Sequence, residues 1–210
     1  MVVFGREPLP GRVKSRLATA IGPEAAARVY EELLRYTLRV AAGTGGVVLS
    51  LADAPSEGWF PVQEPPPFLE VQRGADLGER MGDAFARRFD EGAAQVVVIG
   101  SDCPALRAEH LAAAFDALRA VPAVLGPALD GGYWLVGQRA PGSDMFRGVP
   151  WSTPRTLAAT RERLHRLGVQ WRELDELDDI DRVEDLERAL ADEHVSPELR
   201  TSLRAVLDVM

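Results

Sequence analysis

Short apolar segments alternate with longer segments of helical periodicity along the 210 residues of the chain. Residues 95–100 are almost uniformly apolar, which is typical of a strand buried on both faces of a parallel sheet. Residues 23–42 instead repeat apolar side chains about every 3.6 positions and carry a proline in the first turn, which favours a helix. This alternation predicts an α/β fold in which helices cover both faces of one mostly parallel sheet.

The remaining elements follow from the same two patterns. Strands are expected at residues 1–4, 47–51, 68–71, 95–100, 123–126, 133–137 and 169–174. Helices are expected at residues 23–42, 76–89, 107–119, 153–167, 183–191 and 197–207. The proline-rich stretch 55–67 is expected to be a loop. A chain of this length with one continuous alternation predicts a single domain over residues 1–210.

The overall charge narrows the class of ligand. The formal net charge is −8 at pH 7. A nucleic-acid partner is not expected, because such proteins usually carry a clustered basic surface. A membrane partner is not expected either, since no stretch approaches the roughly 20 apolar residues of a membrane span. A small, metal-chelated substrate suits an acidic protein better.

The first residues and the cysteine content predict the compartment. Residues 1–8 lack the basic segment and the long apolar segment of a secretion signal. Cys103 is the only cysteine, which excludes an intrachain disulfide and a zinc site made of four thiolates. We therefore expect a cytoplasmic protein.

The loop that follows the first predicted strand, residues 5–17, combines glycines with basic side chains. In a parallel sheet such a loop lies at the carboxyl edge, where ligands bind, and a nearby helix N-terminus favours anions. Lys14 is the only lysine among 24 basic residues, which indicates a position where an ammonium cannot be exchanged for a guanidinium. An exposed basic turn is the alternative interpretation. The candidate phosphate-binding residues are Gly5, Arg6, Gly11, Arg12, Lys14 and Arg16.

Two acidic motifs could supply a metal site. Asp102 lies in the small-residue turn that ends the apolar strand 95–100. A single carboxylate there suits Mg²⁺, which keeps its other positions for water and phosphate oxygens. Asp181 precedes a predicted helix, with Glu184 three positions later, which is also the form of a capping box. Each aspartate therefore has two interpretations, as a cap of a turn or helix and as a ligand of Mg²⁺ or Mn²⁺.

A third motif joins two predicted strands through Asp130 and two glycines. It can form merely the turn of a hairpin. It can equally admit a ligand close to the backbone, with Asp130 as a catalytic base or an acceptor-binding group. Trp151 also has two interpretations, as a core or staple residue and as a stacking platform. The candidate acceptor-binding residues are Gly131, Gly132, Tyr133, Trp134 and Trp151, and further candidate nucleotide-binding residues are Asp76 and Arg80.

In their order and in their residues these motifs resemble those of the bacterial family called rSAM/selenodomain-associated transferase 1, within the GT-A glycosyltransferase-like superfamily. The resemblance runs nearly end to end and rests on residues 10–17, 76–81, 100–104, 126–135, 150–154 and 179–186. Parts of the pattern are similar to the phospholactate guanylyltransferases and the molybdenum-cofactor nucleotidyltransferases. The resemblance implies a single-domain GT-A fold with three α/β/α layers.

The resemblance also implies roles for residues that spacing leaves open. Lys14, with Arg12 or Arg16, would hold a diphosphate. Asp102 would be the principal ligand of the metal, and Asp181 would be the second carboxylate.

Together the motifs predict a metal-dependent transferase that takes a group from a nucleotide-activated donor. The expected catalytic residues are Lys14, Asp102 and Asp130. The leading hypothesis is a glycosyltransferase that uses a nucleotide sugar. A nucleotidyltransferase that joins a nucleoside triphosphate to a phosphorylated acceptor is the alternative, and a nucleotide-binding protein without catalysis is the third hypothesis.

Overall fold

Six of seven strands run in one direction in the computed structural model of the protein, which describes residues 1–61, 65–141 and 144–208. The strands are β1 (Val2–Gly5), β2 (Val48–Leu51), β3 (Phe68–Val71), β4 (Val96–Ile99), β5 (Ala123–Pro127), β6 (Tyr133–Gln138) and β7 (Trp171–Glu173). Their order across the sheet is β3-β2-β1-β4-β6-β5-β7, and β6 is antiparallel to both of its neighbours. The predicted mostly parallel sheet is confirmed.

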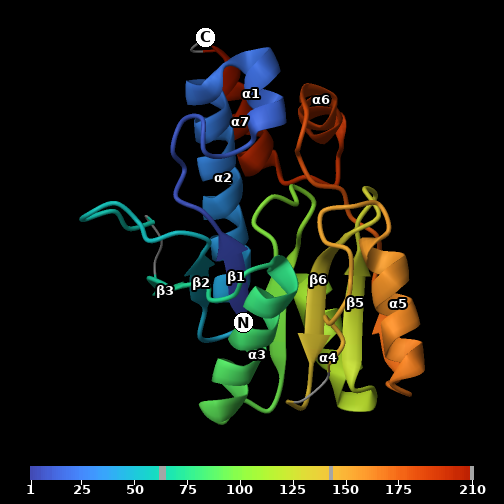
Figure 1. Ribbon diagram of the computed structural model, residues 1–210. Helices are drawn as coiled ribbons and strands as arrows, with labels where there is room; N and C mark the ends of the chain where they lie inside the picture. The colour runs from blue at the N-terminus through green and yellow to red at the C-terminus, as the bar shows by residue number, and fades with distance from the viewer. Residues whose placement is uncertain (62–64, 142–143, 209–210) are drawn as a thin grey trace.

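Helices cover both faces of this sheet (Figure 1). They are α1 (Ser15–Ile21), α2 (Pro23–Ala42), α3 (Leu77–Asp90), α4 (Ala108–Ala120), α5 (Thr156–Arg166), α6 (Val183–Ala191) and α7 (Pro197–Asp208). Side chains alternate along each strand and so separate two cores. Val97 and Ile99 of β4 pack with α2, α4, α6 and α7, whereas Val96 and Val98 pack with α3 and α5. The predicted three-layer fold is confirmed.

Two helices differ from the sequence-based expectation. Helix α1 was not predicted, because its seven residues are too few for a helical period to stand out. The helix expected at residues 153–167 begins only at Thr156. Ser152 adopts a φ of +57°, so the chain makes a tight turn before the helix can start.

One strand is shorter than expected, whereas the expected proline-rich loop is found. The strand expected at residues 169–174 is reduced to the three residues of β7. The stretch 55–67 contains no helix or strand in its described part, and residues 62–64 of that stretch lie outside the described residues. Within the described ranges, no helix combines the length and the apolarity that a membrane span requires.

The carboxyl ends of the parallel strands lie together at the upper edge of the sheet in Figure 1. The loop after β1 and the loop after β4 leave the sheet side by side there, because β1 and β4 are parallel neighbours with Val3 opposite Ile99. The turn between β5 and β6 lies at the same edge, since β6 runs in the opposite direction to β5. The topology therefore collects three of the four predicted motifs in one place, namely the basic loop, the Asp102 turn and the Asp130 turn.

Candidate active site

Lys14 and Asp102 form a buried ion pair at this edge. The ammonium nitrogen lies 2.7 Å from Oδ2 of Asp102, and the lysine side chain is only 7% exposed. Lys14 adopts φ 48° and ψ 48°, a left-handed conformation that is uncommon for a residue with a side chain and is often found at functional sites. Burial alone would lower the pKa of Lys14, but the Asp102 carboxylate outweighs it, so the pKa lies above its ordinary value and the ammonium stays charged.

Arg16 and Asp181 form a second ion pair. A guanidinium nitrogen of Arg16 lies 2.6 Å from Oδ2 of Asp181. The backbone N–H of Ile180 donates a hydrogen bond to the carbonyl oxygen of Asp102 at 3.1 Å, which holds the two acidic loops against each other. The structure thus brings together the basic loop and both acidic motifs, which the sequence separates by up to 165 positions.

A cavity of 520 Å³ opens beside these ion pairs, and we call it cavity A. It lies between the loop after β1 and the start of α3, and its volume is in the range of small-molecule sites. The predicted residues that line it are Gly5, Arg6, Arg12, Lys14, Asp76, Arg80, Asp102 and Asp181. Among the described lining residues, Gly11 and Arg16 are missing, although Arg16 reaches Asp181 at the cavity wall.

A second cavity of 220 Å³, which we call cavity B, adjoins cavity A. The predicted residues that line it are Asp102, Asp130, Gly132, Tyr133, Trp134 and Trp151. Gly131 does not line it, because this glycine turns at φ +86° against the backbone of Pro154. The two cavities share a wall made of Leu77, Gly100, Asp102 and Ser152. Asp102 therefore faces both spaces.

Asp179 is a residue of the candidate site that was not predicted from the sequence. It lines cavity B, and burial together with the nearby charge of Asp102 raises its pKa to about 6. A local pattern could have revealed it, because Ile180 between the two aspartates is fully buried. An apolar residue that points inward turns both flanking acids toward the other side.

The predicted capping box is wrong by one residue. The N-cap of α6 is Arg182, and the carboxylate of Asp185 accepts hydrogen bonds from the backbone N–H groups of Asp181 at 3.0 Å and Arg182 at 2.6 Å. Asp185, and not Glu184, is therefore the side chain that accepts the capping hydrogen bonds. Since Asp185 caps the helix, the carboxylate of Asp181 is available for Arg16 and for cavity A.

Several predicted binding residues also have structural roles. Asp76 is the N-cap of α3 and accepts a hydrogen bond from the Glu79 N–H at 2.8 Å. Trp134 is 4% exposed, and its indole N–H donates to the carbonyl oxygen of Asp175 at 3.1 Å. Trp151 packs against Gly78 of α3. The two tryptophans therefore form walls whose shape the fold fixes.

The carboxylates that line cavity A match a hard divalent cation. Asp102 and Asp181 both offer carboxylate oxygens to cavity A, and each already holds a cationic side chain at 2.7 Å or less. Within the described parts of the chain, no group of three or more His, Cys, Asp or Glu residues could hold a metal alone. Two carboxylates, completed by water and phosphate oxygens, are a ligand set that Mg²⁺ accepts.

Comparison with solved structures places this site in a known fold. A protein of Desulfovibrio desulfuricans G20 that carries the name of a nucleotide-diphospho-sugar transferase is 30% identical, with a TM-score of 0.87, over 99% of this chain and 93% of that chain. This likeness confirms the predicted nucleotide-diphospho-sugar transferase fold.

More distant structures show the same fold alone. Rv0371c of Mycobacterium tuberculosis H37Rv, solved in complex with manganese, is 20% identical with a TM-score of 0.52, over 90% of this chain and 96% of that chain. CMP:2-keto-3-deoxy-manno-octonic acid synthetase, solved with CTP, is 16% identical with a TM-score of 0.51, over 89% of this chain and 94% of that chain.

Sequence comparison identifies the family. No curated protein sequence matches the chain. Residues 37–153, which are more than half of the chain, match the model of a family described as uncharacterized proteins conserved in bacteria, DUF2064. With this match and the 30% identical relative, the protein belongs to the DUF2064 family of bacterial proteins.

Proposed function

We propose that this protein is a metal-dependent glycosyltransferase that takes a sugar from a nucleotide-sugar donor. The protein is a transferase, as its 30% identical relative from Desulfovibrio desulfuricans is named, and the sugar donor is the part that we add. The resemblance to the rSAM/selenodomain-associated transferase 1 family supports this choice. The observation that carries the proposal is the wall that cavities A and B share, because a donor in A and an acceptor in B would meet at Asp102.

Cavity A would hold the nucleotide diphosphate of the donor. Lys14 and Arg12 line it and would bind phosphate oxygens, and Arg6, at the start of the same loop, lines it as well. Lys14 suits this role because its ammonium is buried and stays charged. A fixed positive charge helps catalysis when the charge on the leaving diphosphate grows in the transition state.

Asp102 and Asp181, which both line cavity A, would hold Mg²⁺ or Mn²⁺, with Asp179 close to Asp102. When bound, the metal would neutralise phosphate charge and orient the donor. A protein of the same fold binds manganese, which supports the choice of a divalent metal.

Cavity B would hold the acceptor, and Asp130 would act as its base. Oδ1 of Asp130 accepts a hydrogen bond from the Gly132 N–H at 2.7 Å, which fixes the orientation of the carboxylate. The acceptor oxygen would bond to the anomeric carbon as the bond from that carbon to the phosphate oxygen breaks. The acceptor proton would pass to Asp130, and a nucleoside diphosphate would leave.

A nucleotidyltransferase is the second candidate. A phosphorylated acceptor in cavity B would then attack the α-phosphorus of a nucleoside triphosphate, and pyrophosphate would leave. A protein of the same fold was solved with CTP, which favours this alternative. A nucleotide-binding protein without catalysis is the third candidate, and it would use cavity A alone.

Thermal unfolding against a panel of ligands tests these three candidates. The panel contains the four common nucleoside triphosphates and their nucleotide sugars, each with Mg²⁺, Mn²⁺ or EDTA. A ligand at 100 times its dissociation constant should stabilise the protein by about 2.7 kcal/mol. We expect a metal-dependent shift that is largest with a nucleotide sugar.

The variant Asp102→Asn should lose the metal-dependent part of the shift. Asp144→Asn is the matched control, because Asp144 is exposed and pairs with Arg163 at 2.8 Å, and neither residue lines cavity A or cavity B. A larger shift with a triphosphate, followed by pyrophosphate release, would establish the nucleotidyltransferase instead. No shift with any donor would refute both enzymatic candidates.

A further inference from the structure

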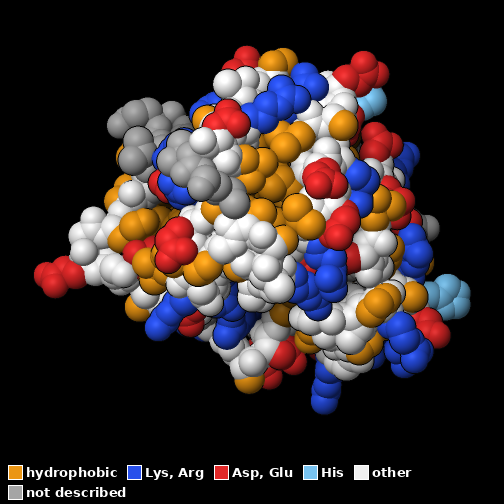
Figure 2. All heavy atoms as spheres, turned by 90° about the horizontal axis from the view of Figure 1, so that it is seen from above, with side chains coloured by type: hydrophobic (Ala, Val, Ile, Leu, Met, Phe, Trp, Pro, Cys, Tyr) orange, Lys and Arg blue, Asp and Glu red, His pale blue; other side chains and the backbone are white. Residues whose placement is uncertain are grey.

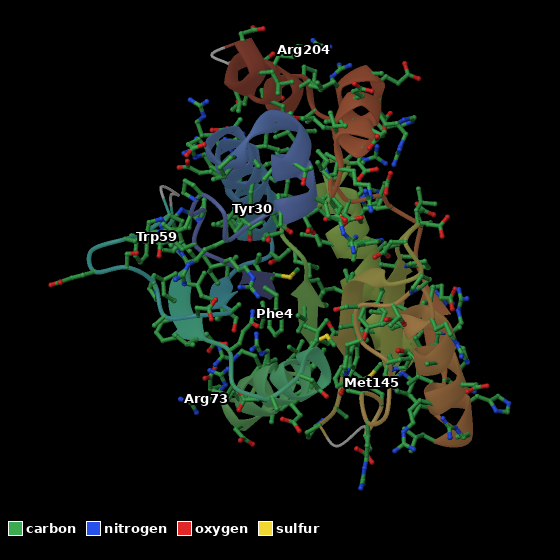
Figure 3. All side chains as sticks on the ribbon, turned by 45° about the horizontal axis from the view of Figure 1, so that its top comes forward. Phe4, Tyr30, Trp59, Arg73, Met145 and Arg204 are labelled. Carbon is green, nitrogen blue, oxygen red and sulfur yellow. The ribbon has the colours of Figure 1, made fainter. Side chains whose placement is uncertain are left out.

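A buried hydrogen-bonded chain connects α2 to the wall of cavity A. Tyr30 is 5% exposed, and Figure 3 labels it on α2. Its hydroxyl oxygen accepts a hydrogen bond from the backbone N–H of Arg6 at 2.9 Å. The same oxygen lies 2.8 Å from Oγ of Ser101, the residue that precedes Asp102.

Counting donors and acceptors fixes the direction of this chain. A tyrosine hydroxyl has one proton to donate, and among the described residues its partners are only the Arg6 N–H and the Ser101 oxygen. The Arg6 N–H can only donate. If Ser101 donated as well, the proton of Tyr30 would be buried without an acceptor, which is costly. Tyr30 therefore donates to Ser101.

The proton of Ser101 is then the free end of the chain. Ser101 is 4% exposed and lines cavity A, directly beside Asp102. Within the described part of the chain, Tyr30 is the one hydrogen-bonding partner of its side chain. Burial raises the pKa of Tyr30, so its hydroxyl keeps the proton that it donates. Each link in the chain polarises the next in the same direction.

We propose that the Ser101 hydroxyl donates a hydrogen bond to a phosphate oxygen of the nucleotide in cavity A, and that Tyr30 is the positioning residue that orients it. This inference rests on the proposed function, because it needs a nucleotide in that cavity. It adds a phosphate-binding side chain that carries no charge. Gly5 leaves the space in which the Tyr30 hydroxyl lies, since a Cβ at position 5 would lie only 3.3 Å from the Tyr30 oxygen and 3.2 Å from Leu49.

The test measures nucleotide affinity by calorimetry in the presence of Mn²⁺. The probe is whichever nucleoside triphosphate or nucleotide sugar of the ligand panel the wild-type protein binds most tightly. Ser101→Ala should lower the affinity about tenfold or more, because the lost hydrogen bond is to a charged group. Tyr30→Phe should lower it by roughly three- to tenfold, because Ser101 remains but can rotate.

The double variant separates an indirect role from a general structural one. If Tyr30 acts through Ser101, adding Tyr30→Phe to Ser101→Ala should change the affinity by no more than about twofold. Tyr36→Phe is the matched control. Tyr36 lies on the same helix, is equally buried and donates to the carbonyl oxygen of Leu106 at 2.7 Å, away from both cavities. The nucleotide affinity of the Tyr36→Phe variant should stay within about twofold of the wild type, although this variant also loses one hydrogen bond.

Three results would overturn the inference. Equal affinities for Ser101→Ala and the wild type would remove Ser101 from the phosphate. A larger loss for Tyr30→Phe than for Ser101→Ala, or fully additive losses in the double variant, would mean that Tyr30 acts independently. A wild-type protein that binds none of the four triphosphates and no nucleotide sugar would refute the proposed function as well, and this outcome is distinct from the other two.

Discussion

Gly78→Ala should destabilise the protein by pushing Trp151 away from α3. A Cβ at position 78 would lie 2.6 Å from Cζ2 and 2.7 Å from Nε1 of Trp151, closer than such atoms can approach. Exchanging glycine for alanine inside a helix normally stabilises by about 1 kcal/mol. Overpacking of a buried contact costs about 1–3 kcal/mol, so the net effect should be a loss of up to about 2 kcal/mol.

Gly82 supplies a control in the same helix. It lies one turn further along α3, and a Cβ there would meet nothing within 4 Å. Gly82→Ala should therefore show only the helix preference, a gain of about 1 kcal/mol. For a chain of this size each kcal/mol moves Tm by roughly 2–4 °C, so the two variants should shift Tm in opposite directions.

Thermal unfolding followed by circular dichroism measures both variants. The effect of Gly78→Ala should vanish in a Trp151→Leu background, where the smaller side chain leaves room for the new methyl group. Since Trp151 lines cavity B, Gly78→Ala should also weaken acceptor binding more than nucleotide binding. Equal stabilisation by Gly78→Ala and Gly82→Ala would refute the close contact between α3 and Trp151.

Three further predictions concern other described residues. Asp179 has a pKa of about 6, above its usual value because of burial, so its ionised form disfavours the folded state. The protonated form of Asp179 contributes stability that is present below pH 4 and is lost as the pH rises through 6. In urea titrations Asp179→Asn should therefore raise the free energy of unfolding at pH 7, by no more than about 2 kcal/mol after solvent screening, and change it little at pH 4. Asp185→Ala should destabilise α6 by about 1–2 kcal/mol and Glu184→Ala by much less, since Asp185 accepts the two capping bonds; comparable losses in urea unfolding would contradict this assignment. Burial raises the pKa of the Cys103 thiol, so a thiol reagent should label it only as fast as the protein unfolds, and rapid labelling of the native protein would contradict its burial.

The sequence predicted much of the site because several residues carry information by themselves. Lys14 is the only lysine, and it is the residue that meets Asp102 at 2.7 Å. Asp102 lies in the turn that follows a uniformly apolar strand, so its place at the carboxyl edge needed no tertiary information. Both positions depend on local pattern and on the general geometry of parallel sheets.

Other features depend on contacts that no local pattern records. Residues 184 and 185 are both acidic, and which of them caps α6 depends on where the helix begins, to within one residue. Tyr30 repeats with the apolar positions of α2 and so looks like an ordinary core residue. Its hydrogen bond to Ser101 joins positions 71 apart, and only the packing of α2 on the sheet brings them together.

The reversed strand β6 has a consequence for how this enzyme can diversify. Because β6 runs against β5, a short turn at residues 128–132 replaces the crossover helix that a parallel connection would need. That turn contributes Asp130 and Gly132 to cavity B and nothing to the wall of cavity A among the described residues. Under the proposed function, changes in its length or sequence would reshape the acceptor side while the nucleotide side keeps its architecture, so that one donor site would serve relatives with different acceptors.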